Sequence, residues 1–285
     1  MSAEYAVLLQ RIEELENDTR FLPYIGALRK EIADMNKEWY AEIRKGNIPG
    51  HSIVHKFGRN DAIPNGTWAF ITNLGQTGHV LSAATTVRVK AGNAADDTAG
   101  AGAREVTVQG IVATTFLEEE EAITTAGVSA STATSKSFWR IHRSWVSAAG
   151  TYGDANTAAV VIENGAGGTD IHTIAIEEGQ SQDAVWTVPL GFKGYLLGVY
   201  VTVDANKSAD VRVFTRADID VTSAPVKSKR LKKYFDGILG PHTYKPVAAN
   251  SMIPAKGDIW VEARGSGATT EVSADIEILL VEDGY

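Results

Sequence analysis

The chain has 285 residues, of which 22% are charged and 44% are hydrophobic, and it carries a net charge of −8 at pH 7. That composition is typical of a globular protein able to bury a sizeable core, and the acidic balance argues against general nucleic-acid binding. The chain has no cysteine, which excludes disulfides, thiolate metal sites and cysteine nucleophiles.

The N-terminus, Met1–Tyr5, lacks the basic region and the long apolar run of a signal peptide. No stretch contains the roughly 20 apolar residues that a bilayer-spanning helix needs. We therefore expect a soluble protein that is made in a cytoplasm and does not insert into a membrane.

Residues 1–47 are predicted to form a helical docking or oligomerisation segment. Apolar residues recur every three or four positions along two helices, which places them on one stripe of each helix. Pro23 suits the first turn of the second helix, and Gly46 and Pro49 end it. The stripe residues are Leu8, Ile12 and Leu15, then Ile25, Leu28, Ile32, Met35 and Trp39. Either the helices pack on their own chain, or their stripes are buried against another subunit.

Residues 48–79, rich in proline and glycine, are predicted to be an irregular connector. From residue 80 onward, short runs alternate apolar and polar residues, the period of a half-buried strand. Strands are predicted at residues 80–90, 104–114, 116–124, 137–147, 158–163, 170–176, 184–188, 194–204, 209–216, 229–235, 258–263 and 271–282.

The predicted fold class is mainly β, with a short N-terminal α-helical segment and two antiparallel β-sandwich, jelly-roll-like domains. The polar stretch 177–183 suggests a boundary between residues 80–178 and 179–285, although one continuous two-sheet structure also fits. Helical crossovers are missing from the pattern after residue 80, which argues against an α/β enzyme fold.

Two charged runs interrupt the alternation. The basic run Lys227–Lys233 fits a solvated edge strand that its lysines protect from pairing, or a patch facing an acidic partner. The acidic run Glu118–Glu121 fits a solvated hairpin or edge strand; calcium or a basic partner, or a catalytic carboxylate pair, are the alternatives.

The histidines and the loop acids give weak metal signals. His51 and His55 are four residues apart but lie in a stretch that looks extended, and His142 and His172 fit structural positions inside strands. A loop with Asn93, Asp96 and Asp97 does not have the EF-hand spacing. We expect no metal, no cofactor, no catalytic residues and no enzymatic activity.

An aromatic and basic run, residues 138–145, is the remaining candidate site. On a regular strand Trp139, Ile141 and Arg143 share one face, and Phe138, Arg140 and His142 share the other. Aromatic residues and arginine are enriched in interface hot spots and also stack on sugars. Trp139, Arg143 and Trp145 are therefore candidates for a core strand, a subunit contact or a glycan platform.

Several segments resemble a family of accessory virion structural proteins of tailed bacteriophages. The segments are 53–60, 65–68, 89–104, 121–127, 186–195 and 207–212, so the resemblance covers roughly residues 50–285. It implies a component of the phage particle that assembles as a homo-oligomer, for which we expect a trimer, and it carries over no catalytic residues. Implied partners are other virion proteins, such as the major capsid or tail proteins, and a host surface glycan.

The leading functional hypothesis is a non-enzymatic virion protein on the particle exterior, assembled in the host cytoplasm, with a head decoration (cement) protein preferred. A tail fibre or adhesin is the alternative within that class. A bacterial carbohydrate-binding module is an alternative of another class, because tryptophans on a sandwich can bind sugars. A polysaccharide-degrading enzyme would need a paired carboxylate site to which nothing in the sequence points.

Overall fold

The computed structural model describes residues 38–73, 81–151, 155–247, 251–267 and 269–285. The chain forms two compact units, Met1–Ser52 and Ile53–Tyr285. The predicted stripe residues from Leu8 to Met35 lie outside the described residues.

The first unit contributes one described helix, α3 (Trp39–Arg44), which the positive-φ Gly46 follows. Glu42 accepts hydrogen bonds from the Lys45 ammonium at 2.8 Å and the Asn47 amide at 2.6 Å, and these contacts fasten the turn after the helix. The helix therefore ends just before Gly46, where the sequence predicts its end.

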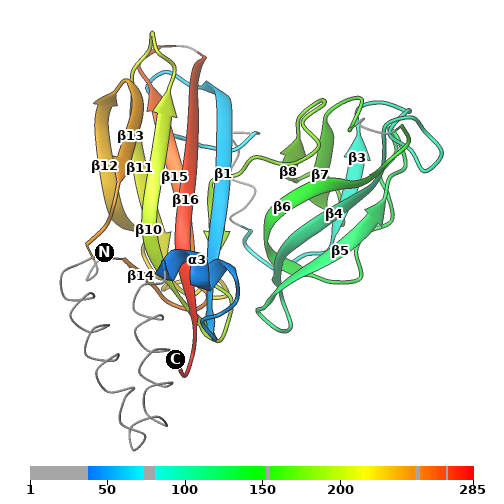
Figure 1. The fold of residues 1–285 in the computed structure, drawn as a ribbon. Coiled ribbons are helices and arrows are strands. Elements are labelled where there is room, and N and C mark those ends of the chain that lie inside the picture. The colour runs from blue at the N-terminus through cyan, green and yellow to red at the C-terminus, as the bar shows by residue number, and fades with distance from the viewer. Residues whose placement is uncertain (1–37, 74–80, 152–154, 248–250, 268) are drawn as a thin grey trace, which may run out of the picture. The chain divides into compact units, whose positions relative to one another are not determined.

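The second unit is built mainly of antiparallel strands in four sheets (Figure 1). One sheet has the order β1-β16-β10-β13 with β14 beside β10, and a second has the order β12-β11-β15-β2 with β9 beside β15. Their strands are β1 (His51–Ile63), β2 (Ala69–Phe70), β9 (Val185–Thr187), β10 (Phe192–Val203), β11 (Ala209–Arg216), β12 (Arg230–Ile238), β13 (Gly240–Tyr244), β14 (Met252–Ile253), β15 (Asp258–Gly265) and β16 (Thr270–Glu282).

These two sheets, the first sheet pair, share one apolar core. Alternate residues of β11 and β15, such as Val211, Val213 and Val261, meet alternate residues of β10 and β16, such as Val199 and Ile276. All five are fully buried. Burying a valine or isoleucine side chain contributes about 1.5–3 kcal/mol, so this core is a main source of stability.

The other two sheets, the second sheet pair, have the orders β3-β7-β8 and β5-β4-β6. Their strands are β3 (Val87–Ala91), β4 (Ala103–Val112), β5 (Glu118–Thr124), β6 (Phe138–Ala149), β7 (Val160–Asn164) and β8 (Asp170–Ile174). A second core lies between these sheets and includes Val89, Val106, Phe138 and Ile162. The mainly β, antiparallel class is confirmed, while the division into two jelly-roll-like domains stays a prediction.

The connector predicted for residues 48–79 is not irregular, since it holds the 13-residue strand β1 as well as β2. Gly58 on β1 comes so close to the backbone of Ala184 and Ile71 that an added Cβ would collide with both. The inward positions of β1 include Lys56, Gly58 and Asn60, none of them apolar, so the alternation that marks the other strands is missing here.

Both charged runs lie largely on edge strands. The acidic run forms the first part of β5, at one edge of its sheet, and most of the basic run lies on β12, at the edge of another. The edge-strand interpretation is therefore confirmed for both runs.

Candidate functional site

The outer face of the β12-β11-β15-β2 sheet carries the most distinctive surface chemistry of the described residues. Because side chains alternate along a strand, the core residues Val211 and Val213 leave Arg212, Phe214 and Arg216 on the opposite face of β11. The antiparallel register then sets residues of β15 directly opposite them: Arg212 faces Glu262, Phe214 faces Trp260 and Arg216 faces Asp258.

An aromatic layer forms the base of this face. Phe214 stacks on Trp260 with ring centroids 5.7 Å apart, and Phe70 from β2 lies at 6.4 Å from Trp260. With Val185 these residues make a small buried cluster, separate from the main core. Such a layer gives the charged side chains around it a firm apolar backing.

Arg212 is fixed in place on this layer. Its guanidinium lies 3.6 Å from the centre of the Trp68 ring and donates two hydrogen bonds, of 2.9 and 2.7 Å, to Oε2 of Glu262. The other carboxylate oxygen of Glu262 accepts a 2.8 Å bond from Trp260 Nε1. A bidentate, stacked arginine is held far more rigidly than a surface lysine, so its orientation is preset.

Two adjoining hollows lie on this surface and at the sheet edge beside it. One, of about 610 Å³, is lined by Trp68, Arg212, Lys229 and Glu262 among others. The next, of about 690 Å³, is lined by Asp218, Arg230 and Lys232 among others. Both are also lined by Arg216, Val226, Lys227 and Ser228, and we call the continuous depression the basic groove.

A second constellation links the two sheet pairs within residues 53–285. Arg140 of β6 and Asp258 of β15 are 0% and 1% exposed, and their side chains meet at 3.0 Å. Asp258 also accepts a 2.7 Å hydrogen bond from the Thr187 hydroxyl. A buried guanidinium needs such a partner, because an unpaired buried charge costs several kcal/mol.

Lys56 and two histidines complete this buried polar layer. The Lys56 ammonium donates to the His142 carbonyl oxygen, and His142 Nδ1 lies 2.5 Å from Glu118, which also accepts from Trp186 at 3.2 Å. Burial, reinforced by the nearby charge of Arg143, lowers the pKa of Lys56 to about 8. Burial likewise lowers the pKa of His142 and that of His172. The Nδ1 atom of His172 lies 3.2 Å from the Asp183 carboxylate.

The layer matches a structural role better than an acid–base one. His142 and His172 were predicted to be structural residues inside strands, and both lie buried on β6 and β8. Their Nε2 atoms are buried and have no hydrogen-bond partner among the described residues. Within those residues no three His, Cys, Asp or Glu side chains are grouped so as to hold a metal ion.

The predicted pattern of β6 needs one correction. Strict alternation would put Phe138, Arg140 and His142 on one face, but Phe138 and Ile141 both enter the apolar core of the second sheet pair. The register between β4 and β6 shifts at several points, including beside Ile141 and Phe138. Each such bulge adds a residue to one strand and reverses the faces beyond it.

The predicted interface residues of β6 are all half-buried. Trp139 stacks against Phe116 with centroids 6.4 Å apart, and Arg143 donates a 3.4 Å hydrogen bond to the His55 carbonyl. The backbone of Trp145 forms an isolated antiparallel β-bridge with that of Gln180. Their role in a subunit contact stays a prediction, as does that of Trp39, which is 49% exposed.

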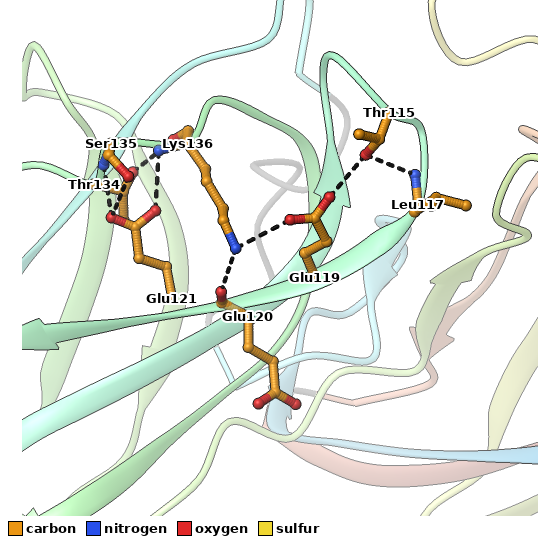
Figure 2. A network of polar contacts seen from close by, with 8 residues as sticks. All are labelled: Thr115, Leu117, Glu119, Glu120, Glu121, Thr134, Ser135 and Lys136. Carbon is orange, nitrogen blue, oxygen red and sulfur yellow. Dashed lines mark hydrogen bonds and ion pairs between the residues drawn. The ribbon is translucent and has the colours of Figure 1, made fainter.

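The rest of the acidic run fastens a loop onto β5 (Figure 2). Glu121 accepts bonds from the backbone amides of Ser135 and Lys136, at 2.6 and 2.9 Å. The Lys136 ammonium in turn lies 3.0 Å from the Glu119 carboxylate and donates to the Glu120 carbonyl at 2.8 Å. The carboxylates of Glu119 and Glu121 are occupied by these contacts, whereas that of Glu120 points away from them, so the three do not converge on one site (Figure 2).

The weak calcium signal also has a structural explanation. Asp96 is fully buried, and its carboxylate accepts hydrogen bonds from the backbone amides of Ala103, Thr157 and Ala158. It thus fastens together two segments that are far apart in the sequence. Nothing in the structure groups it with Asn93 and Asp97 around a common ion position, because those side chains cap their own turns.

Sequence reasoning missed the basic groove as a site. Its parts come from the loop before β2, from β11, from β15 and from the segment leading into β12, and only the fold unites them. The one visible signal was the run Lys227–Lys233, which already suggested an acidic partner.

In the described part of the chain, no helix has the length and apolarity needed to cross a membrane.

No protein-family model matches the sequence, and no curated protein matches it significantly. Among solved structures, the chain is similar to the structure of infectious bursal disease virus, Gt strain, with a TM-score of 0.24 and 9% identity over 87% of this chain and 79% of that chain. A mutant VP2 protein of the same virus, in derived T=1 particles, gives a TM-score of 0.14 and 10% identity over 82% and 76%. At these TM-scores the likeness carries no argument about fold or function.

Proposed function

We propose that the chain is a non-enzymatic structural protein on the exterior of a tailed-bacteriophage particle, with head decoration (cement) as its role. The observation that carries the proposal is the resemblance of residues 50–285 to accessory virion proteins. The mainly antiparallel β architecture with two apolar cores supports it, because such a body is a rigid scaffold for presenting a surface.

In this proposal the chain assembles as a homo-oligomer, a trimer, through its N-terminal segment. The apolar stripes that the sequence places at Leu8, Ile12, Ile32 and Trp39 support this, because leaving stripes of that size without a covering partner would be costly. Full-length chains carrying Ile12→Asp and Ile32→Asp should fall to monomers in mass photometry. The matched variant Thr132→Asp, changed at an exposed residue, should keep the oligomer. Equal masses for Ile12→Asp, Ile32→Asp and Thr132→Asp would refute the assignment.

A tail fibre or adhesin is the second candidate, and the basic groove favours it because a recognition surface is what such a protein needs. A cryo-EM map of the particle separates the two roles. Density for this chain spread over the capsid faces supports decoration, whereas density confined to the tail supports the fibre. If the map shows no density for this chain on either the capsid or the tail, the assignment to a particle is contradicted.

A further inference from the structure

We propose that the basic groove is a binding site for an acidic polysaccharide chain, which it holds by the carboxylate groups of the sugars. The proposal rests on the groove alone and does not depend on the place of the protein in a particle. It assigns the cationic run at Lys227–Lys233, so far only an edge strand, to a specific chemistry.

The first argument is a local reversal of charge. The chain carries a net charge of −8, yet this one surface is cationic. The cations lining the groove are Arg212, Arg216, Lys227, Lys229, Arg230 and Lys232, against Asp218 and Glu262. A concave surface of one sign concentrates ligands of the opposite sign and speeds their association.

Two of the acids near the groove, Glu262 and Asp258, are already occupied. Glu262 is 6% exposed and accepts bonds from Arg212 and Trp260. Asp258, beside Arg216, is bound by the buried Arg140. By contrast, Lys227 and Arg230 are exposed, and among the described residues neither side chain has an ion pair or hydrogen bond. Their charges are available to an anionic ligand.

The third argument concerns which polyanion fits. Single-stranded nucleic acid is usually held by bases stacking on open aromatic faces. Here Trp260 is 4% exposed and stacked on Phe214, and the Trp68 ring is covered by Arg212 at 3.6 Å and approached by Arg264 at 4.8 Å. The aromatic residues position cations and offer no platform for bases. The planar guanidinium of Arg230, which is exposed, can pair with a sugar carboxylate.

The volumes of the two hollows are the fourth reason to expect a polysaccharide ligand. Hollows of about 610 and 690 Å³ fall in the range of sites for small organic groups, which is roughly 300–1,000 Å³. Each can take a few sugar rings, and the two hollows share the lining residues Arg216 and Val226–Ser228, so one sugar chain can contact both. A nucleic-acid duplex is too wide to enter either.

The test is isothermal titration calorimetry of the full chain with an oligogalacturonate of defined length, at low and physiological salt. We expect binding that weakens as salt rises, because the contacts are exposed charge pairs. The variant K227Q/R230Q should bind about tenfold more weakly, since each exposed charge pair contributes up to about 1 kcal/mol. Both side chains are exposed, so the variant should keep the wild-type melting temperature.

The matched control is K90Q/K193Q, which removes the same charge from exposed sites on β3 and β10. It should bind like the wild type. The proposal is overturned if oligogalacturonate does not bind, if both double variants weaken it equally, or if a neutral oligoglucoside of equal length binds as well. Tighter binding of a thymidine oligonucleotide, lost in K227Q/R230Q, would assign the groove to nucleic acid and also overturn it.

Discussion

The buried ammonium of Lys56 should make the stability of the fold depend on alkaline pH in a defined way. Lys56 is 4% exposed and lies among His142, Arg143 and Glu118. Its pKa is about 8 in the folded protein, against 10.5 for an ordinary lysine. Between these values the unfolded chain binds a proton that the folded chain does not, so the contribution of Lys56 to stability rises with pH.

The size of the effect follows from the difference in pKa. A difference of about 2.5 units, at 1.36 kcal/mol per unit, corresponds to roughly 3 kcal/mol. We therefore expect the free energy of unfolding of the wild type, relative to that of Lys56→Met, to rise by roughly 3 kcal/mol between pH 7 and pH 10.5. The lost hydrogen bond to the His142 carbonyl adds only an offset that does not change with pH.

Urea denaturation of both proteins at a series of pH values measures this difference directly. Comparison within the pair cancels the titration of groups that do not interact with Lys56, and the pKa values of its neighbours His142, His172 and Glu118 are all lowered, so these groups titrate below this pH range. The control is Lys90→Met, which removes an exposed ammonium from β3. Its free energy of unfolding, plotted against pH, should run parallel to that of the wild type. A Lys56 difference that stays flat within about 1 kcal/mol would show that this ammonium is not held in a desolvating site.

Three further results are expected. Asp258→Asn should destabilise the fold by about 3–5 kcal/mol in urea denaturation because it leaves Arg140 buried without its counter-charge, and adding Arg140→Met should recover part of the loss; an undiminished loss would contradict this. Burial lowers the pKa of His172, so the unfolded chain binds the extra proton and stability falls as pH drops below 6.5; His172→Gln should make the fall in melting temperature shallower, and an unchanged slope would oppose the assignment. Gly58→Ala should lower the melting temperature by several degrees, since its Cβ would meet the backbone of Ala184 and Ile71, whereas Gly267→Ala has open space and should change it little; equal effects would speak against the close approach.

Regular, half-buried strands could be predicted from the sequence. β11 was predicted and found at the same bounds, Ala209–Arg216, because its inward residues Ala209, Val211 and Val213 are apolar and alternate with polar ones. β1 was missed since its inward positions carry Lys56, Gly58 and Asn60, whose burial depends on partners from β6 and β2. The faces of β6 were wrong because bulges depend on how β4 pairs with it, which a single strand does not reveal.

The candidate site was less predictable than the fold. The cationic half of the basic groove is contiguous in sequence and was visible as Lys227–Lys233. Its other half combines Trp68 with Arg212 and Trp260, three residues from distant segments that the sheet register brings together. Alternation predicts which face each side chain takes, but it does not predict which strands become neighbours.

The central claim, that this chain is a structural component on the outside of a phage particle, is tested most directly by its copy number in purified particles. Quantitative mass spectrometry of gradient-purified virions would measure the chain relative to the major capsid protein. We expect a copy number of the same order as that of the capsid protein, unchanged by a high-salt wash. Absence of the chain from washed particles would contradict the claim, and a few copies per particle would refute head decoration.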